Sequence, residues 1–368
     1  MKFSADQTKF SEALKRVQSV IPGKDLKSLV LQNVLLVAEA GRLTLTTTDM
    51  YLTIVTSIDC IVTEPGATTL PVKILANIVS CAPEGVVEVD VDNETQNAKI
   101  LAGRARYRLS GIQASVFPPL AQIEPEQTFT HEQALVKEMM RKTNFAVSQL
   151  EDSRRSTKGL LMRWKEGQFH MVATDGRCLS QVTKEVPLPP LEKQVDIIVP
   201  LKSAIEIQRN LATEGNVTID VVERKYAAFT FGDVKIYTKL IDDVYPAYEA
   251  AIPRDLEYSI KVDRQAMLSS LNRVQAVVSG MVSVAIRFAD NMMYMSINAG
   301  EIGNGSDEIP VKYDGEEINV MFDTKYLKSA LDVLDDDEIV FNIRNGSVPV
   351  IIRCSVPVII VLMPLRIS

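Results

Sequence analysis

The segment LPVKILANIV (70–79) places a strand-like apolar residue, two further residues, a lysine and an amphipathic helical run in that order. The same order returns at VPLKSAIEIQ (199–208) and again at FDTKYLKSAL (322–331). The copies begin at residues 70, 199 and 322. Short solenoid repeats return about every 20 to 50 residues, which is much less than the distance between these copies. Three copies within 368 residues therefore indicate a repeat of whole-domain size.

Further elements recur around each copy in a constant order. An amphipathic helix with a β-prone entry is expected at 3–20, 129–147 and 260–278. Alternating strand pairs are expected at 29–49, 159–175 and 284–299. More strands close the copies at 85–112, 216–241 and 338–363. The order strand, helix, strands, helix, strands predicts an α+β fold in which each domain consists of two βαβββ halves.

Two proline-containing connectors, PPLAQIEPEQ (118–127) and PAYEAAIPRD (246–255), separate the copies. They predict three similar domains at 1–125, 126–252 and 253–368. Three similar domains in a row tend to form an arc, which either stays open or closes with a second copy through head-to-tail contacts.

The long helices carry signals for their starts and buried faces. Asp6 and Asp263 stand where an N-cap residue belongs. The residues expected on the buried faces share helical spacing and are Phe10, Leu14 and Val17 in the first helix and Met267, Leu271, Val274 and Val278 in the third.

Cysteine and histidine usage argues against several kinds of site. The cysteines form no CxxC pair and have no histidine near them in sequence; they are Cys60, Cys81, Cys178 and Cys354. The histidines are His131 and His170 alone, so histidine-based catalysis is not expected. We expect free thiols in a reducing, cytoplasmic compartment, no metal site and no cofactor.

The longest apolar run, VPVIIVLMPL (356–365), is about half as long as a bilayer crossing requires. Its β-branched residues and prolines favour a strand, so a soluble protein without a membrane partner is predicted.

Charge is distributed unevenly along the chain. Each of the six predicted helices carries a net charge of +1, so the helices sum to +6 and the remainder to −13 within a total of −7. One explanation is that lysine and arginine simply favour helices. The functional explanation is that all six helices face a common polyanion. A weak attraction to phosphates that does not depend on base sequence would let the protein slide along a nucleic acid.

Several segments together resemble a known family. These are MKFSADQTKFSEALKRVQSVI at the start, PVKIL, VATDGRCLS (172–180), IVPLK and VLMPLRIS (361–368). In this order and spacing they resemble the bacterial DNA polymerase III beta subunits, the replicative sliding clamps, through all three domains.

The resemblance implies a ring-shaped homodimer of DNA-clamp domains, with helices lining the hole and sheets outside. It implies no catalytic activity. The implied partners are duplex DNA bound without sequence preference, the polymerase catalytic subunit, the clamp-loader complex and other proteins with a clamp-binding motif. Twelve helices at 8–10 Å spacing would enclose a hole roughly 24 Å wide, which admits a duplex of about 20 Å.

The resemblance also implies a hydrophobic pocket for partner peptides between the second and third domains. The matching positions are Thr174, Gly176, Arg177, Leu179, Pro246, Val361, Leu362, Met363, Pro364, Leu365 and Arg366. Departures from the family pattern at Arg177-Cys178 and Ala250 predict a pocket of altered charge. Cys178 is also weighed as a reactive thiol, the less favoured interpretation.

DNA contacts and ring closure are implied in the same way. The predicted DNA contacts are Lys24, Lys73, Arg141, Arg154, Arg155 and Lys202. The predicted dimer interface pairs Arg104, Arg106 and Tyr107 with Val277, Val278 and Glu301, and Asp307 and Glu308 are further acidic partners for the arginines.

Two alternatives stay open. A three-domain enzyme would need a site, but GEIGNG (300–305) lacks a phosphate-loop context and DDDE (335–338) lacks ligand spacing and suits a solvated turn. A monomeric peptide-binding scaffold would differ from a ring by its molecular mass in solution.

Overall fold

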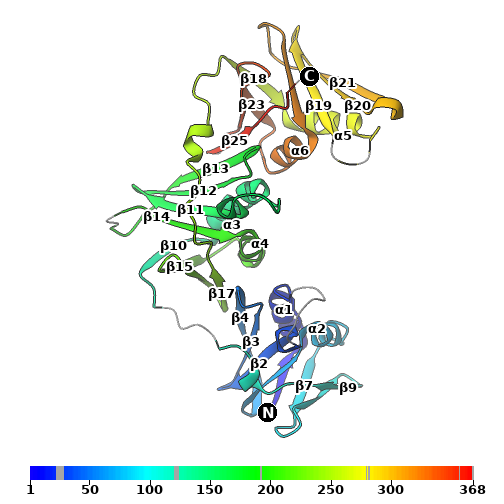
Figure 1. Ribbon diagram of the computed structural model, residues 1–368. Helices are drawn as coiled ribbons and strands as arrows, with labels where there is room; N and C mark the ends of the chain where they lie inside the picture. The colour runs from blue at the N-terminus through cyan, green and yellow to red at the C-terminus, as the bar shows by residue number, and fades with distance from the viewer. Residues whose placement is uncertain are drawn as a thin grey trace. The chain divides into compact units, whose positions relative to one another are not determined.

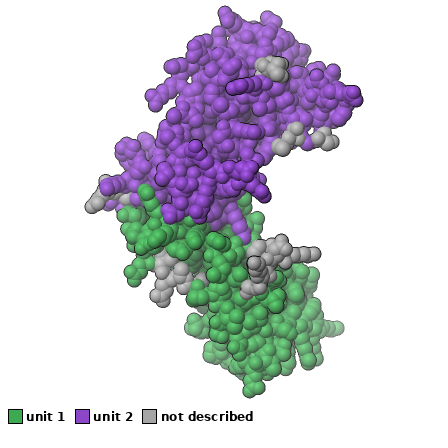
Figure 2. All heavy atoms as spheres, in the orientation of Figure 1, with its two compact units in different colours: residues 1–137, 205–240 green, residues 138–204, 241–368 purple. Residues whose placement is uncertain are grey.

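The computed structural model describes residues 1–21, 29–119, 124–190, 193–278, 280, 282–355 and 357–366 (Figure 1). The chain forms two compact units, coloured separately in Figure 2. Unit 1 contains residues 1–137 and 205–240, and unit 2 contains residues 138–204 and 241–368.

The elements of the first third alternate as the sequence predicts. Its first half contains β1 (Lys2–Asp6), α1 (Gln7–Gln18), β2 (Asn33–Glu39), β3 (Arg42–Thr48) and β4 (Leu52–Asp59). The short strand β5 (Ile61–Glu64) precedes the second half, which contains β6 (Gly66–Pro71), α2 (Val72–Ser80), β7 (Val86–Val91), β8 (Asn97–Ala102) and β9 (Ala105–Ser110).

The middle third repeats this order. Its first half contains β10 (Gln127–Glu132), α3 (Gln133–Thr143), β11 (Gly159–Lys165), β12 (Gln168–Thr174) and β13 (Cys178–Glu185). Its second half contains β14 (Val195–Pro200), α4 (Leu201–Asn210), β15 (Asn216–Val222), β16 (Tyr226–Phe231) and β17 (Val234–Lys239).

The last third does so again. Its first half contains β18 (Tyr258–Asp263), α5 (Arg264–Gln275), β19 (Ser283–Ala289), β20 (Met292–Asn298) and β21 (Asn304–Pro310). Its second half contains β22 (Ile318–Asp323), α6 (Thr324–Asp332), β23 (Glu338–Ile343), β24 (Val350–Arg353) and β25 (Val358–Leu362). The predicted plan of βαβββ halves is confirmed, with β5 as an addition.

Four sheets organise these strands. Unit 1 has a five-stranded sheet in the order β5-β1-β7-β8-β9 and an eight-stranded sheet in the order β10-β15-β16-β17-β4-β3-β2-β6. Unit 2 has an eight-stranded sheet in the order β14-β11-β12-β13-β25-β24-β23-β18 and a four-stranded sheet in the order β21-β20-β19-β22. Each large sheet crosses a predicted domain boundary, at the antiparallel pairs β4–β17 and β13–β25. Continuous backbone hydrogen bonding explains why the compact units divide the chain differently from the predicted domains.

The helix starts follow from local chemistry. The Asp6 carboxylate accepts from the Lys9 N–H at 3.0 Å, and Asp263 accepts from the Ala266 N–H at 2.7 Å. Both predicted caps are confirmed. Helices α2 and α4 instead begin immediately after a proline, whose missing N–H is not needed there.

The buried helix faces agree with the predicted spacing. Phe10, Leu14 and Val17 have no exposed surface, and α1 packs against α2, β3 and β4. In α5 the prediction holds up to Val274, but the helix ends at Gln275. The predicted extension of this helix to Val278 is wrong, because the chain turns there, with the Val278 N–H donating to the Gln275 carbonyl at 3.1 Å.

Among the described residues, every α-helix has more lysine and arginine than aspartate and glutamate. None of the described helices combines the length and hydropathy needed to cross a bilayer. The cysteines are free, as predicted.

Candidate functional site

The segment TDGRCL and the C-terminal strand lie side by side in the large sheet of unit 2. β13 pairs with β25 in a register that sets Leu179 opposite Val361 and Cys178 opposite Leu362. The exposed fraction of each of these four side chains is 3% or less. Because neighbouring residues of a strand point to opposite faces, Leu179 and Val361 lie on one face of the sheet and Cys178 and Leu362 on the other. All four are buried, so the neighbouring exposed groups would make any direct contact with a ligand.

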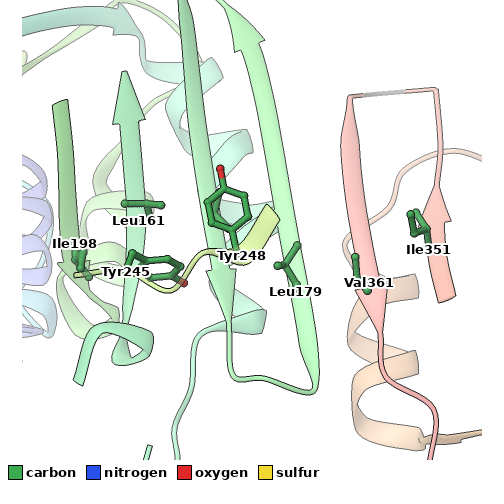
Figure 3. Close-up of a cluster of buried hydrophobic side chains, with 8 residues drawn as sticks. Leu161, Leu179, Ile198, Tyr245, Tyr248, Ile351 and Val361 are labelled. Atoms are coloured by element: carbon green, nitrogen blue, oxygen red, sulfur yellow. The ribbon is translucent and has the colours of Figure 1, made fainter. Parts of the chain in front are cut away.

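The connector after β17 covers this part of the sheet. A row of buried apolar side chains runs across six strands and consists of Ile198, Leu161, Val172, Leu179, Val361 and Ile351 (Figure 3). Tyr245 and Tyr248 of the connector pack on the row, together with Ile241, Ile252 and Leu256. Burial raises the pKa of Tyr245, so its phenol stays neutral.

A tight turn joins β12 to β13. The Thr174 N–H donates to the Tyr245 hydroxyl at 3.1 Å, and the Thr174 hydroxyl donates to the Cys178 carbonyl at 2.8 Å. Gly176 has φ +87°, a backbone conformation that side chains rarely adopt, and open space surrounds it. The Asp175 carboxylate accepts from the N–H groups of Arg177 and Cys178, both at 2.9 Å.

Tyr326 of α6 is a member of this site that sequence reasoning missed. Its hydroxyl donates to the second oxygen of Asp175. Burial, followed by the nearby Asp175 carboxylate, raises the pKa of Tyr326, so it acts as a neutral donor. The only signal was its place in the third copy of the lysine segment, at FDTKYLKSAL.

The C-terminal tail leaves the sheet beside the turn. The Met363 N–H donates to the Arg177 carbonyl at 2.9 Å, and the Leu365 N–H donates to the Met321 carbonyl at 2.7 Å. The Met363 side chain is 44% exposed, Arg177 and Arg366 are exposed, and Pro246, Pro364 and Leu365 are half-buried. The accessible part of the predicted pocket is therefore apolar and cationic.

Cys178 does not fit a reactive thiol. It is 1% exposed, and burial and then Asp175 raise its pKa well above the ordinary value. Because the thiolate is the nucleophile, this environment suppresses reactivity.

An ionic cluster forms where α3 meets the turn before β23. Arg141 donates to Glu138 at 2.8 Å and also contacts Asp335. The Lys142 side chain is 1% exposed, and its ammonium lies 2.8 Å from Glu138 and 3.4 Å from Asp335. The segment DDDE is exposed at Asp335, Asp337 and Glu338, in keeping with the predicted solvated turn, and Asp335 in addition helps to neutralise a buried lysine. No group of metal-ligating side chains occurs among the residues described.

Among the described residues, the five-stranded and the four-stranded sheet each have an edge strand that is paired on one side only. β9 is the outer strand of the five-stranded sheet, with Arg106 exposed and Tyr107 half-buried. β21 is the outer strand of the four-stranded sheet. Each edge offers a row of backbone donors and acceptors to another strand.

Comparison with known proteins covers the whole chain. Family models of the DNA polymerase III beta subunit match the N-terminal domain at residues 1–121, the central domain at 130–247 and the C-terminal domain at 249–366. The chain belongs to the DNA polymerase III beta subunit family.

Relatives and solved structures of the family agree. The beta sliding clamp of Synechococcus elongatus is 28% identical over 376 residues, spanning 100% of this chain and 99% of that protein. The beta sliding clamp of Pseudomonas aeruginosa is 28% identical over 86% of each chain. The crystal structure of DNA polymerase III subunit beta from Pseudomonas aeruginosa has a TM-score of 0.92, 26% identity and complete coverage of both chains. A Bartonella birtlesii clamp bound to griselimycin has a TM-score of 0.92 and 27% identity, with complete coverage of both chains.

The DNA contacts inferred for this beta-subunit chain fall in different environments. Lys24 lies outside the described residues. Lys73 and Lys202 are exposed at the second residue of α2 and α4, and Arg154 and Arg155 are exposed just before β11. Arg141 is already held by two carboxylates, so contact with a phosphate would compete with Glu138 and Asp335.

The residues predicted for the dimer interface of the beta-subunit chain lie on several elements. Arg104 is exposed at the turn into β9, and Glu301 is exposed at the turn before β21. Val277 and Val278 are half-buried after the end of α5. Asp307 forms an ion pair with Arg273 at 2.5 Å within the same chain, so pairing with the arginines would compete with this contact.

Proposed function

We propose that this family member is a non-catalytic sliding clamp, which closes with a second copy around duplex DNA and tethers a polymerase through the site between β13 and β25. The family supports the clamp assignment. The observation that carries the tethering site is the β13–β25 pairing, because it brings Arg177 and the exposed Met363 together from distant parts of the sequence.

The titratable groups fit a binding role. Burial lowers the pKa of His131 to about 4 and also lowers the pKa of His170. Both shifts favour the neutral imidazole at pH 7. The net positive charge of each helix supports loose, sequence-independent contact with phosphates.

Ring closure is tested by mass and by topology. Sedimentation of the purified protein should give a mass of twice 40.8 kDa. In a separate assay, the protein loaded on circular plasmid should be retained on it and be released when the plasmid is cut. Arg106→Glu at the β9 edge should weaken the dimer, whereas Arg224→Glu, an exposed arginine in a turn, should not. A monomeric mass, or equal retention on circular and linear DNA, would rule out a closed ring.

The tethering site is tested with the polymerase catalytic subunit of the same organism. Met363→Ala should lower its affinity for the clamp about tenfold, the scale expected for a central apolar anchor. Val86→Ala removes an exposed valine (60% exposed) from the start of β7 and serves as the matched control. Unchanged affinity in Met363→Ala would contradict the site, and loss of the dimer in that variant would contradict the separation of the two surfaces.

A further inference from the structure

Unit 1 contains a second copy of the turn that organises the candidate tethering site. Residues 48–52 connect β3 to β4 and repeat the hydrogen bonds of residues 174–178. In both turns the threonine hydroxyl donates to the carbonyl four residues later, at 3.3 and 2.8 Å, and accepts from the N–H two residues later, at 3.0 and 3.1 Å. The aspartate then accepts from the next two N–H groups of the turn at 2.7 to 2.9 Å.

The strand next to each turn is joined in the same way. The Tyr51 carbonyl accepts from the Lys239 N–H at 2.8 Å, as the Arg177 carbonyl accepts from Met363 at 2.9 Å. β4 then pairs with β17 just as β13 pairs with β25. The backbone of the tethering site is thus reproduced within unit 1.

The turn in unit 1 has a methionine where the turn in unit 2 has a glycine. Met50 has φ +75° where the other turn has Gly176. A non-glycine residue in this conformation is strained, and glycine would form the same turn without strain. The Met50 side chain is nevertheless 62% exposed and that of Tyr51 is 66% exposed. Folding of the turn does not account for two exposed apolar side chains at its tip.

Aromatic and cationic side chains extend this surface across β17 and β16. Lys239 lies opposite Tyr226 in the sheet, and its ammonium lies 5.7 Å from the centre of the Tyr51 ring. The Lys235 ammonium lies 5.0 Å from the centre of the Tyr237 ring. Strand alternation places these groups on one face of the sheet. We call the surface formed by the following residues the tyrosine–lysine patch: Met50, Tyr51, Tyr226, Lys235, Tyr237 and Lys239.

The charge of the patch defines its ligand. Within the described ranges, neither Lys235 nor Lys239 forms an ion pair, although the chain has a net charge of −7. Cations that contact only aromatic rings remain available to carboxylates. Methionine adapts to varied apolar partners, and tyrosine supplies rigid contact area.

We propose that the tyrosine–lysine patch is a second docking site, for an extended acidic peptide of a partner protein with an aromatic or leucine anchor. The anchor would pack on Met50 and Tyr51 while its carboxylates face Lys235 and Lys239. The site lies entirely in unit 1 and goes beyond the proposed tethering function.

Fluorescence anisotropy of the full-length protein with a labelled octapeptide, Gly-Asp-Leu-Asp-Phe-Asp-Glu-Gly, tests this site. Tyr51→Ala should weaken binding about tenfold, as expected for loss of an aromatic anchor. Lys239→Glu should weaken binding roughly fivefold and reduce its salt dependence. Both side chains are exposed, so the fold should persist, which circular dichroism would verify.

Met363→Ala provides the matched control, because it removes the corresponding tail contact in unit 2. It should leave the octapeptide affinity unchanged while polymerase binding falls. Three results would each overturn the proposal. The first is a failure of the octapeptide to bind the unmodified protein, and the second is an equal affinity of that protein for a version with lysine in place of every acidic residue. The third result is an octapeptide affinity that falls in Met363→Ala but not in Tyr51→Ala. Tyr51-dependent binding of oligothymidylate in place of the octapeptide would also overturn it.

Discussion

Replacing Glu138 with glutamine should destabilise unit 2 by leaving a buried cation poorly neutralised. Glu138 accepts from Arg141 and lies 2.8 Å from the Lys142 ammonium, whose side chain is 1% exposed. After the substitution, Asp335 at 3.4 Å would be the remaining carboxylate at Lys142. Breaking one partner of a buried pair is costly because the other charge stays desolvated.

The magnitude follows from the pKa of Glu138. Hydrogen bonding from Arg141, with a further contribution from Lys142, lowers this pKa from 4.5 to about 2. The full shift corresponds to roughly 3 kcal/mol. The Glu138 side chain is 40% exposed, and solvent screening reduces the expected loss to about 1–2 kcal/mol.

The pH dependence has a definite sign. Because folding lowers the pKa of Glu138, its contribution is fully present above the unfolded value of 4.5 and disappears as the pH falls toward about 2. The difference in unfolding free energy between the two proteins should therefore be constant near neutrality and shrink progressively below about pH 4.5.

Hydrogen–deuterium exchange of α3 under increasing urea is the suitable assay, because two compact units need not unfold together. Glu151→Gln, which removes an exposed carboxylate from the same unit, is the control and should change little. Equal stability of Glu138→Gln and the control at pH 7 would refute the reasoning. So would a difference that grows as the pH falls.

Three further outcomes are expected. Tyr245→Phe removes the acceptor of the buried Thr174 N–H and should cost about 1–2 kcal/mol in urea unfolding; no loss would mean that this bond is not needed. Met50→Gly should raise stability by roughly 1 kcal/mol by relieving the left-handed strain, whereas a lower stability would contradict that strain. In native thiol labelling, exposed Cys81 should react quickly and Cys178 only on unfolding, and similar rates would contradict the burial of Cys178.

Much of the fold was predictable because its signals are local. Apolar spacing located the helices. Asp6 and Asp263 marked the starts of two of them, because each side chain accepts a hydrogen bond from the backbone N–H three residues later. The threefold repeat of a lysine segment gave the βαβββ halves, since each copy carries the same pattern of alternation. The end of α5 was missed because it depends on a turn at Gln275 that the apolar spacing does not mark.

The candidate site was predictable only through resemblance. TDGRCL and the C-terminal tail look unrelated in sequence, and nothing local indicates that Leu179 lies opposite Val361. The family pattern grouped these positions into one pocket, but it gave neither their strand pairing nor Tyr326, whose contact with Asp175 spans 151 positions. Equally, the basic character of Arg141 was visible while its two carboxylate partners were not.

By itself, the sequence determined the identity and order of the elements, the repeat and the positive charge of the helices, because these depend on residues a few positions apart. The tertiary structure alone decided which edges join into eight-stranded sheets, which charges are neutralised and which side chains stay exposed. Those outcomes depend on backbone hydrogen bonds and burial between distant segments, and no local pattern encodes them. The tyrosine–lysine patch belongs to the second kind: its strands are far apart in sequence, and only their pairing makes it a surface.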